Sequence, residues 1–260
     1  MAHLNQDESL MKVLAYNVVS SDITLASEKQ LLVLFQTIRK CPEILEICLN
    51  ISDSNTMYRK LARMSLKTPF VFTSLMNKHM CKSISVLLSH SVCRISKLEL
   101  VGVKLDEAAC LALSKGLEHA GSLHFVSFKD SKMGDSSFAA LSHGISKSKS
   151  IQELDISNCC LSDAGGSSIC SMLRAHTKHR NNLKWGDTLR NTEDEESPLI
   201  ELEGLLTLNA SYNQLGNRFG EGLSMELAAD EWIGAINLSG NQIDTGGSQV
   251  SYTSHEANWN

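Results

Sequence analysis

The chain has 260 residues, 42% of them hydrophobic and only 5% aromatic, so it can bury a sizeable core built mainly from aliphatic side chains. Its formal net charge of -5 gives no reason to expect nucleic acid as an electrostatic partner. No run of residues is apolar and long enough to predict a membrane span, and the polar start lacks the layout of a signal peptide.

The N-terminal third is predicted to hold three degenerate repeat units. A strand at residues 11–17 is followed by a helix around residues 28–38, and a second strand is predicted at residues 44–50. Residues 66–76 are interpreted as a third unit, in which Pro69 leaves the strand register open by one residue. The apolar residues expected on its helix are Cys81, Ile84 and Leu88.

One eleven-residue pattern recurs through the rest of the chain. Residues 151–161, IQELDISNCCL, have aliphatic side chains at positions 1, 4, 6 and 11 and a cysteine at position 9. The same frame begins at residues 95, 123, 205 and 233; three of the four spacings are 28, and the fourth is 54, or 28 plus 26. The first half of each frame alternates with period two, and the second half has apolar residues three and four apart. Each repeat is therefore predicted as strand, turn, helix and return.

This pattern is that of leucine-rich repeats, which can bury their apolar side chains only by stacking on one another. The predicted fold is α/β: a solenoid or horseshoe with a parallel concave sheet, convex helices, about eight repeat units and one helical insertion. Residues 1–247 are predicted to form this domain, with the insertion at about residues 174–200. Residues 248–260 are predicted to be a polar tail, for which we expect disorder.

Turn positions have predicted roles. Position nine is expected to hydrogen-bond the bending backbone, and an Asp or Ser in the turn is expected to cap the helix that follows. The residues at position nine that can form such bonds are Ser131, Cys159, Asn213 and Asn241.

The outward-facing strand positions predict a mixed, moderately polar concave surface. In this architecture such a surface as a whole usually binds proteins, although any single residue is more often simply a solvated side chain. The candidate protein-binding residues of the concave face are Lys97, Glu99, His124, Phe125, Lys129, Glu153, Asp155 and Asn209.

The insertion is basic in its first part and acidic in its second. Sparse leucines after Leu173 predict that the helix of this repeat runs past its usual end, and residues 191–198 are expected to form a solvated loop. A harmless surface excursion is one interpretation. Trp185 favours function, because a tryptophan in a polar insertion must pack down or bind something. The candidate protein-binding residues of the insertion are Lys184, Trp185, Leu189 and Arg190.

No catalytic constellation is recognisable in the sequence. Nucleotide-binding loops, serine-hydrolase elbows and zinc-protease motifs are missing, so we expect no enzyme, no cofactor and no small-molecule substrate. His176 and His179 have helical spacing for a metal, but no further ligands lie near them in sequence; we expect surface histidines and no metal. The eight scattered cysteines are predicted to be free thiols in a reducing compartment.

The 28-residue period resembles the ribonuclease-inhibitor class of leucine-rich repeats, which includes Ran GTPase-activating proteins and innate immune receptors. The order of repeats, basic helical insertion and resumed repeats is more similar to the centrosomal protein of 78 kDa family. The resemblance covers roughly residues 17–245 and includes three segments: CKSISVLLSHSVCRISKLELVGVKL, MLRAHTKHRNNLKWGDTLR and LLTLNASYNQLGNRFGEGLSMELAADEWIGAINLSGNQI. The family's C-terminal coiled-coil region is missing, so we expect a fragment or a short relative.

That resemblance implies a non-catalytic scaffold that acts through other proteins. It further implies a location in the cytoplasm and cytoskeleton, at centrosomes, centrioles or basal bodies, with a role in cilium or centriole biogenesis. Neither nucleic acid nor a membrane is an expected partner. The alternative hypothesis is an enzyme regulator of the GTPase-activating or ribonuclease-inhibitor type, acting through the concave residues Lys97, Glu99, Glu153 and Asp155.

Overall fold

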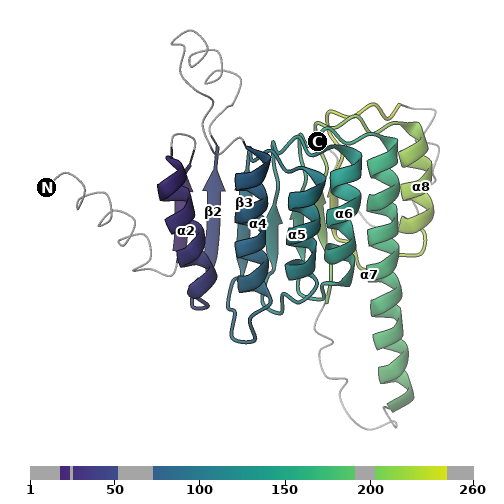
Figure 1. The fold of residues 1–260 in the computed structure, drawn as a ribbon. Helices are drawn as coiled ribbons and strands as arrows, with labels where there is room; N and C mark the ends of the chain where they lie inside the picture. The colour runs from purple at the N-terminus through teal and green to yellow at the C-terminus, as the bar shows by residue number, and fades with distance from the viewer. Residues whose placement is uncertain (1–17, 24–25, 52–72, 191–202, 245–260) are drawn as a thin grey trace, which may run out of the picture.

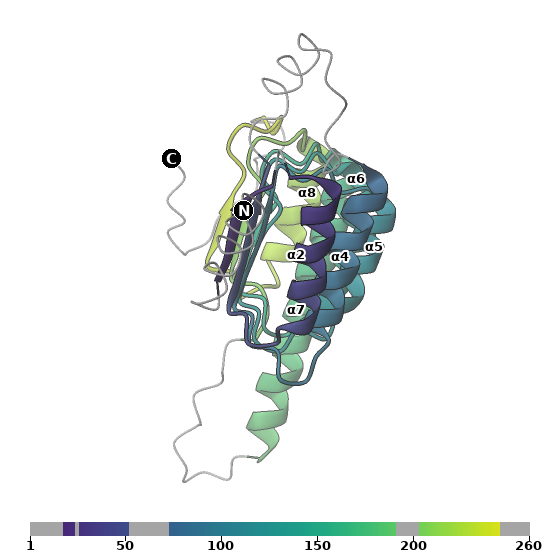
Figure 2. The ribbon, with the colours of Figure 1, turned by 60° about the vertical axis from the view of Figure 1, so that its left-hand side comes forward.

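The computed structural model describes residues 18–23, 26–51, 73–190 and 203–244. Within these ranges, seven parallel strands form one sheet in sequential order, and the helices cover one of its two faces (Figure 1, Figure 2). The predicted α/β leucine-rich repeat solenoid is confirmed. The elements are β1 (Val18–Asp22), α2 (Glu28–Lys40), β2 (Glu46–Asn50), α4 (Ser74–Leu88), β3 (Lys97–Val101), α5 (Glu107–Leu117), β4 (Phe125–Ser127), α6 (Gly134–Lys147), β5 (Glu153–Asp155), α7 (Asp163–Arg190), β6 (Thr207–Asn209), α8 (Asn217–Leu227) and β7 (Ala235–Asn237).

A ladder of aliphatic side chains, one from the middle of each strand, runs across the sheet. Its members, in strand order, are Val19, Ile47, Leu98, Val126, Leu154, Leu208 and Ile236. The first six are at most 2% exposed, so each contributes roughly 1.5–3 kcal/mol relative to an exposed side chain. Neighbours are 28 residues apart in sequence except at two places, where the separations are 51 (28 plus 23) and 54 (28 plus 26).

The structure of the N-terminal third differs from the predicted repeat arrangement. β2 pairs directly with β3, so no strand lies between them, and the separate repeat unit predicted at residues 66–76 is wrong. The end of that run belongs to α4, which begins where Thr73 accepts a hydrogen bond from the Met76 N–H (3.3 Å). Cys81, Ile84 and Leu88 are buried on this helix, as predicted.

The number of repeats changes accordingly. The described part of the chain has seven strands where about eight repeat units were predicted. A second insertion, missed in the sequence, separates β2 from α4 and includes residues 52–72, which lie outside the described residues. The strand predicted at residues 11–17 and the tail at residues 248–260 also lie outside them; the first described strand begins at Val18.

Aspartates accept hydrogen bonds at the starts of α5, α7 and α8, and in the last two cases the aspartate comes from the preceding helix. Asp106 caps its own helix, as predicted, by accepting the Ala109 N–H (2.8 Å). Asp135 instead accepts the Gly165 N–H at the start of the next helix, α7 (3.0 Å). Asp163 in turn accepts the Gly216 N–H at the start of α8 (2.6 Å). A carboxylate at a helix N-terminus satisfies unpaired N–H groups and opposes the helix dipole, so these aspartates also hold consecutive repeats in register.

Position nine has its predicted role. Asn213 accepts the Cys159 N–H (3.0 Å) and donates to the Ile156 carbonyl (2.9 Å), so one amide side chain joins two consecutive turns. Asn241 repeats this arrangement by donating to the Ala210 carbonyl (3.0 Å). These bonds satisfy backbone groups that would otherwise be buried without partners.

The helices α4, α5 and α6 pack closely because glycines face serines between them. The Gly144 N–H donates to Ser114 Oγ (2.9 Å), and a Cβ added to Gly144 would lie 2.1 Å from the Ser114 carbonyl oxygen. Gly116 makes the equivalent approach to Ser85, where a Cβ would lie 2.5 Å from the Ser85 Cα. The helix spacing of the solenoid therefore depends on glycine at these positions. None of the helices in the described residues has the length and apolarity needed to cross a membrane.

Candidate protein-binding surfaces

The concave face holds a group of three predicted residues, Lys97, Glu99 and Phe125, which we call the Phe125 cluster. Lys97 and Phe125 are register partners on β3 and β4. Lys97 Nζ lies 3.1 Å from Glu99 Oε1 and 5.4 Å from the centroid of the Phe125 ring. The ammonium is therefore shared between a carboxylate and an aromatic face. Phe125, predicted to be exposed, is half-buried.

Hydrogen bonding and burial tune the charges of this cluster. The hydrogen bond to Glu99 raises the pKa of Lys97, while burial opposes the shift, so the amine is charged at neutral pH. Burial, followed by a hydrogen bond to Glu99, raises the pKa of the neighbouring Cys48 thiol to about 12. A thiol this hard to ionise is a poor nucleophile.

Two other predicted concave residues are used in the strand ends. Asp155 accepts the Ser157 N–H (2.9 Å), and Asn209 accepts the Ser211 N–H (3.2 Å). These bonds close the turn that follows each strand. Asp155 and Asn209 thus have a structural task whether or not a partner touches them.

The remaining concave candidates lie around the cluster. Glu153 on β5 is exposed and is the register partner of Phe125. His124 and Lys129 are exposed but lie outside β4, one residue before it and two residues after it. The structure therefore brings Lys97, Glu99, Phe125 and Glu153 together. His124 and Lys129 lie beyond the opposite ends of β4.

The helix of the fifth described repeat, α7, extends beyond its neighbours, as predicted. α6 ends at Lys147, and the residue one period later is Ala175, yet α7 continues to Arg190. The extra 15 residues (176–190) add about 22 Å of helix at 1.5 Å per residue. Figure 1 shows this half of α7 projecting past the row of helices.

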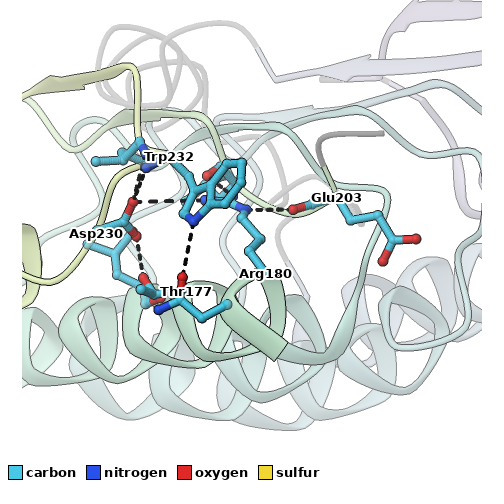
Figure 3. Close-up of polar contacts among 9 residues, drawn as sticks. Thr177, Arg180, Glu203, Asp230 and Trp232 are labelled. Atoms are coloured by element: carbon cyan, nitrogen blue, oxygen red, sulfur yellow. Dashed lines mark hydrogen bonds and ion pairs between the residues drawn. The ribbon is translucent and has the colours of Figure 1, made fainter. Parts of the chain in front are cut away.

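A buried polar network, which we call the Arg180 network, ties the projecting helix to the returning chain (Figure 3). It consists of Thr177, Arg180, Glu203, Asp230 and Trp232. Arg180 Nε donates to the Glu203 carbonyl (2.6 Å) and Nη2 donates to the Leu205 carbonyl. Since Leu205 opens the next repeat, one guanidinium holds the chain at the point where it rejoins the solenoid.

Asp230 is the side-chain acceptor of the network. Its carboxylate accepts the Thr177 hydroxyl and the Trp232 N–H (2.7 Å), and lies 4.0 Å from Arg180 Nη1. Burial lowers the pKa of Arg180, and Asp230 opposes that shift. The returning backbone also needs Gly204, because its φ of +87° is left-handed and a Cβ would lie 2.6 Å from His176 Nδ1.

His176 corrects a prediction. It was expected at the surface, but it is only 3% exposed, as is Arg180. Burial, then the charge of Arg180, lowers the pKa of His176 to about 4, so its ring is neutral at physiological pH. His179 instead bonds Glu203 Oε2 through Nε2 (2.7 Å). No group of three or more potential metal ligands occurs in the described part of the chain.

The predicted insertion residues have different environments. Lys184 Nζ lies 2.9 Å from Glu231 Oε2 and 5.8 Å from the Trp232 ring centroid, which attaches this turn of α7 to the next repeat. Trp185 does not pack down and is 68% exposed. Leu189 and Arg190 belong to the last turn of α7, but their side chains lie outside the described part. None of the five residues of the Arg180 network was among the candidates predicted from the sequence.

Comparison with known proteins agrees with this architecture. A family model described as Leucine Rich repeat matches residues 147–170, which contain β5 and the first turns of α7. The chain is 24% identical over 192 residues to the centrosomal protein of 78 kDa of Mus musculus, covering 74% of this chain and 24% of that protein. It is 27% identical over 160 residues to the centrosomal protein of 78 kDa of Homo sapiens, covering 61% and 23%. The predicted resemblance to the centrosomal protein of 78 kDa is confirmed.

A third relative extends the similarity to insects. The Drosophila melanogaster protein named Protein Cep78 homolog is 25% identical over 192 residues, covering 74% of this chain and 23% of that protein. The chain thus spans about a quarter of the length of the curated relatives it matches. The similarity to the centrosomal protein of 78 kDa covers most of the solenoid rather than one repeat.

Proposed function

We propose that this chain is a non-catalytic protein-interaction scaffold of the cytoskeleton that acts at the centrosome, with a part in centriole or cilium biogenesis. The similarity to relatives named as centrosomal, over 61–74% of the chain, supports the location. The open concave face is the main support for the scaffold role. Among the described residues, no element covers the sheet on the side opposite the helices (Figure 2).

The Phe125 cluster and Glu153 are the proposed centre of this surface. They come from three adjacent strands, β3, β4 and β5, whose spacing of about 4.8 Å places them in one continuous patch. Aromatic side chains flanked by charges are enriched where single residues dominate a protein interface. The ladder of buried aliphatic residues beneath the patch keeps it rigid, so little ordering cost accompanies binding.

A non-catalytic role fits the chemistry of the described side chains. The thiols of Cys48 and Cys110 have pKa values raised to about 12, mainly by burial, which suppresses thiolate chemistry. The lowered pKa of His176 has a structural cause, burial, and its ring lies against Gly204. Binding through a preformed surface is the function that this geometry favours.

A localisation experiment tests the proposal. A tagged copy of the chain should concentrate at centrosomes or basal bodies in ciliated cells, and the concave double variant Phe125→Ala, Glu153→Lys should lose that enrichment. Leu111→Ala is the matched control, because Leu111 is 54% exposed on the convex helix α5. All three proteins should unfold at similar temperatures when purified. A diffuse wild-type chain, or a concave variant that localises normally, would reject the proposal.

A further inference from the structure

The projecting half of α7 carries an exposed strip formed by Lys178, Asn182 and Trp185, which we call the Trp185 strip. These residues are four and three apart, so they lie on one side of the helix. All three are exposed, and Trp185 is 68% exposed although tryptophan is among the largest apolar side chains. A tryptophan held in water at the end of a rigid helix is the type of residue that anchors protein interfaces.

The orientation of the strip is fixed by the opposite side of the same helix. His176 and Arg180 are each 3% exposed and lie against the returning chain. On the flank of the helix, beside the strip, Asn181 accepts the Trp232 indole N–H (3.4 Å), and Lys184 pairs with Glu231 (2.9 Å). The strip therefore faces away from the solenoid, and the helix beneath it is held in place before any partner arrives.

The charge of this helix contrasts with that of the whole chain. α7 contains five Lys or Arg residues and two Asp residues, a formal charge of +3, while the chain has a formal net charge of -5. Arg174 is taken up by Glu226 (3.0 Å from Arg174 Nε to Glu226 Oε2), and Arg180 is buried in its network. Among the described residues, Lys178 has no carboxylate within ion-pair distance. Among the described side chains, the strip thus offers a cation outside any ion pair and an exposed indole.

We propose that the Trp185 strip docks an acidic amphipathic helix of a partner protein, in addition to whatever the concave face binds. Its carboxylates would face Lys178, its apolar side chains would cover the Trp185 indole, and Asn182 would supply a hydrogen bond between them. A helix fits because two straight helices can match contacts spaced three and four residues apart over two turns. An indole in the contact favours a protein over a polyanion, which would need more phosphate-binding cations. The proposal rests on the scaffold function but on a different surface.

Selection from a displayed library of helical peptides, with acidic and apolar residues varied on one face, tests this docking. The full chain is the bait, and Lys178→Glu and Trp185→Ala are parallel baits; Lys82→Glu, an exposed lysine on α4, is the matched control. Wild type and Lys82→Glu should enrich acidic peptides with apolar anchors. Trp185→Ala should weaken the best peptide about tenfold or more. Lys178→Glu should weaken it several-fold and should recover binding when the facing Glu of the peptide is changed to Lys.

Three outcomes overturn the inference. One is enrichment that is equal on the wild type and on both strip variants, or no enrichment on any bait. Another is selection of basic or uncharged peptides. The third is that phosphatidylserine vesicles or a single-stranded oligonucleotide bind the wild type and lose binding in Lys178→Glu, while no peptide does. Failure here leaves the localisation of the concave variants unaffected, so the two proposals fail separately.

Discussion

Two junctions of the solenoid are built in different ways. Between α5 and α6 the period is strict, and the helices meet through Gly144 and Ser114 with almost no side-chain volume between them. After α7, where the period is broken by 26 residues, the chain rejoins the stack through Arg180 and Asp230. A strict repeat needs only small residues in register, whereas a long insertion needs directional polar contacts to return the backbone to its place.

Removal of the Arg180 side chain should cause the largest loss of stability at either junction. Arg180→Met keeps a long apolar stem but leaves two carbonyls without their buried donor and the Asp230 carboxylate without its ion-pair partner. The expected loss is about 3–5 kcal/mol in the free energy of unfolding. Urea unfolding followed by circular dichroism measures it. Arg218→Met, at an exposed position on α8, should change stability by less than about 0.5 kcal/mol. Equal midpoints for the two variants would show that the network is dispensable.

Gly144→Ala tests the other junction. A Cβ at this position would collide with the Ser114 carbonyl, so we expect a loss of about 2–3 kcal/mol despite the better helix propensity of alanine. Gly186→Ala is a matched control in α7, where a Cβ would meet nothing within 4 Å; it should be neutral or stabilising by up to about 1 kcal/mol. The midpoints of urea unfolding compare them. If the two substitutions shifted the midpoint in the same direction, the close helix approach would not limit stability.

The regular part of the fold was accessible from the sequence because its cause is local and periodic. The apolar frame at residues 95, 123, 151, 205 and 233 predicts strands that the structure places within two residues of the expected start. The N-terminal error arose because residues 66–76 are apolar enough to imitate a frame. Continuing the 28-residue ladder backward from Ile47 to Val19 would have revealed β1, and the 51 residues from Ile47 to Leu98 would have revealed the second insertion.

The Arg180 network was only partly accessible. Ile169, Leu173, His176 and Arg180 are spaced four, three and four residues apart, so the apolar stripe of α7 continues into a histidine and an arginine. That spacing could have predicted that His176 and Arg180 are buried. It could not have supplied Glu203 or Asp230, which lie 23 and 50 residues further along the chain from Arg180. Partners across an insertion have no fixed spacing, and only the fold brings them together.

The buried histidine of the same junction should make stability depend on pH. Burial holds the pKa of His176 at about 4, whereas an unfolded histidine has a pKa near 6.5. Above pH 6.5 the ring is neutral in both states and the full stability is present. As the pH falls towards 4, only the unfolded chain takes up the proton, so stability is lost. Between pH 7 and pH 5 this group should cost about 2 kcal/mol.

The measurement is the difference in unfolding free energy between pH 7 and pH 5, compared for wild type and His176→Gln. The variant should show a smaller loss on acidification, because carboxylates elsewhere affect both proteins alike. His143→Gln, at an exposed position on α6, should keep the wild-type dependence. Identical pH profiles for wild type and His176→Gln would mean that the ring is protonated in the folded chain or reaches solvent.

The smallest change in stability is expected at the Phe125 cluster, where a cation, a carboxylate and an aromatic ring meet at the surface rather than in the interior. Lys97→Met removes an ion pair with Glu99 and a contact with the Phe125 ring, yet Lys97 remains partly solvated on the concave face. Exposed pairs of this type contribute less than about 1 kcal/mol, so the urea midpoint should scarcely move. A loss of stability comparable to that of Arg180→Met would show that Lys97, like the buried arginine, is needed to hold the fold together. A near-neutral result, together with weaker centrosomal enrichment of the variant, would mark the concave charges as kept for binding rather than for holding the solenoid together.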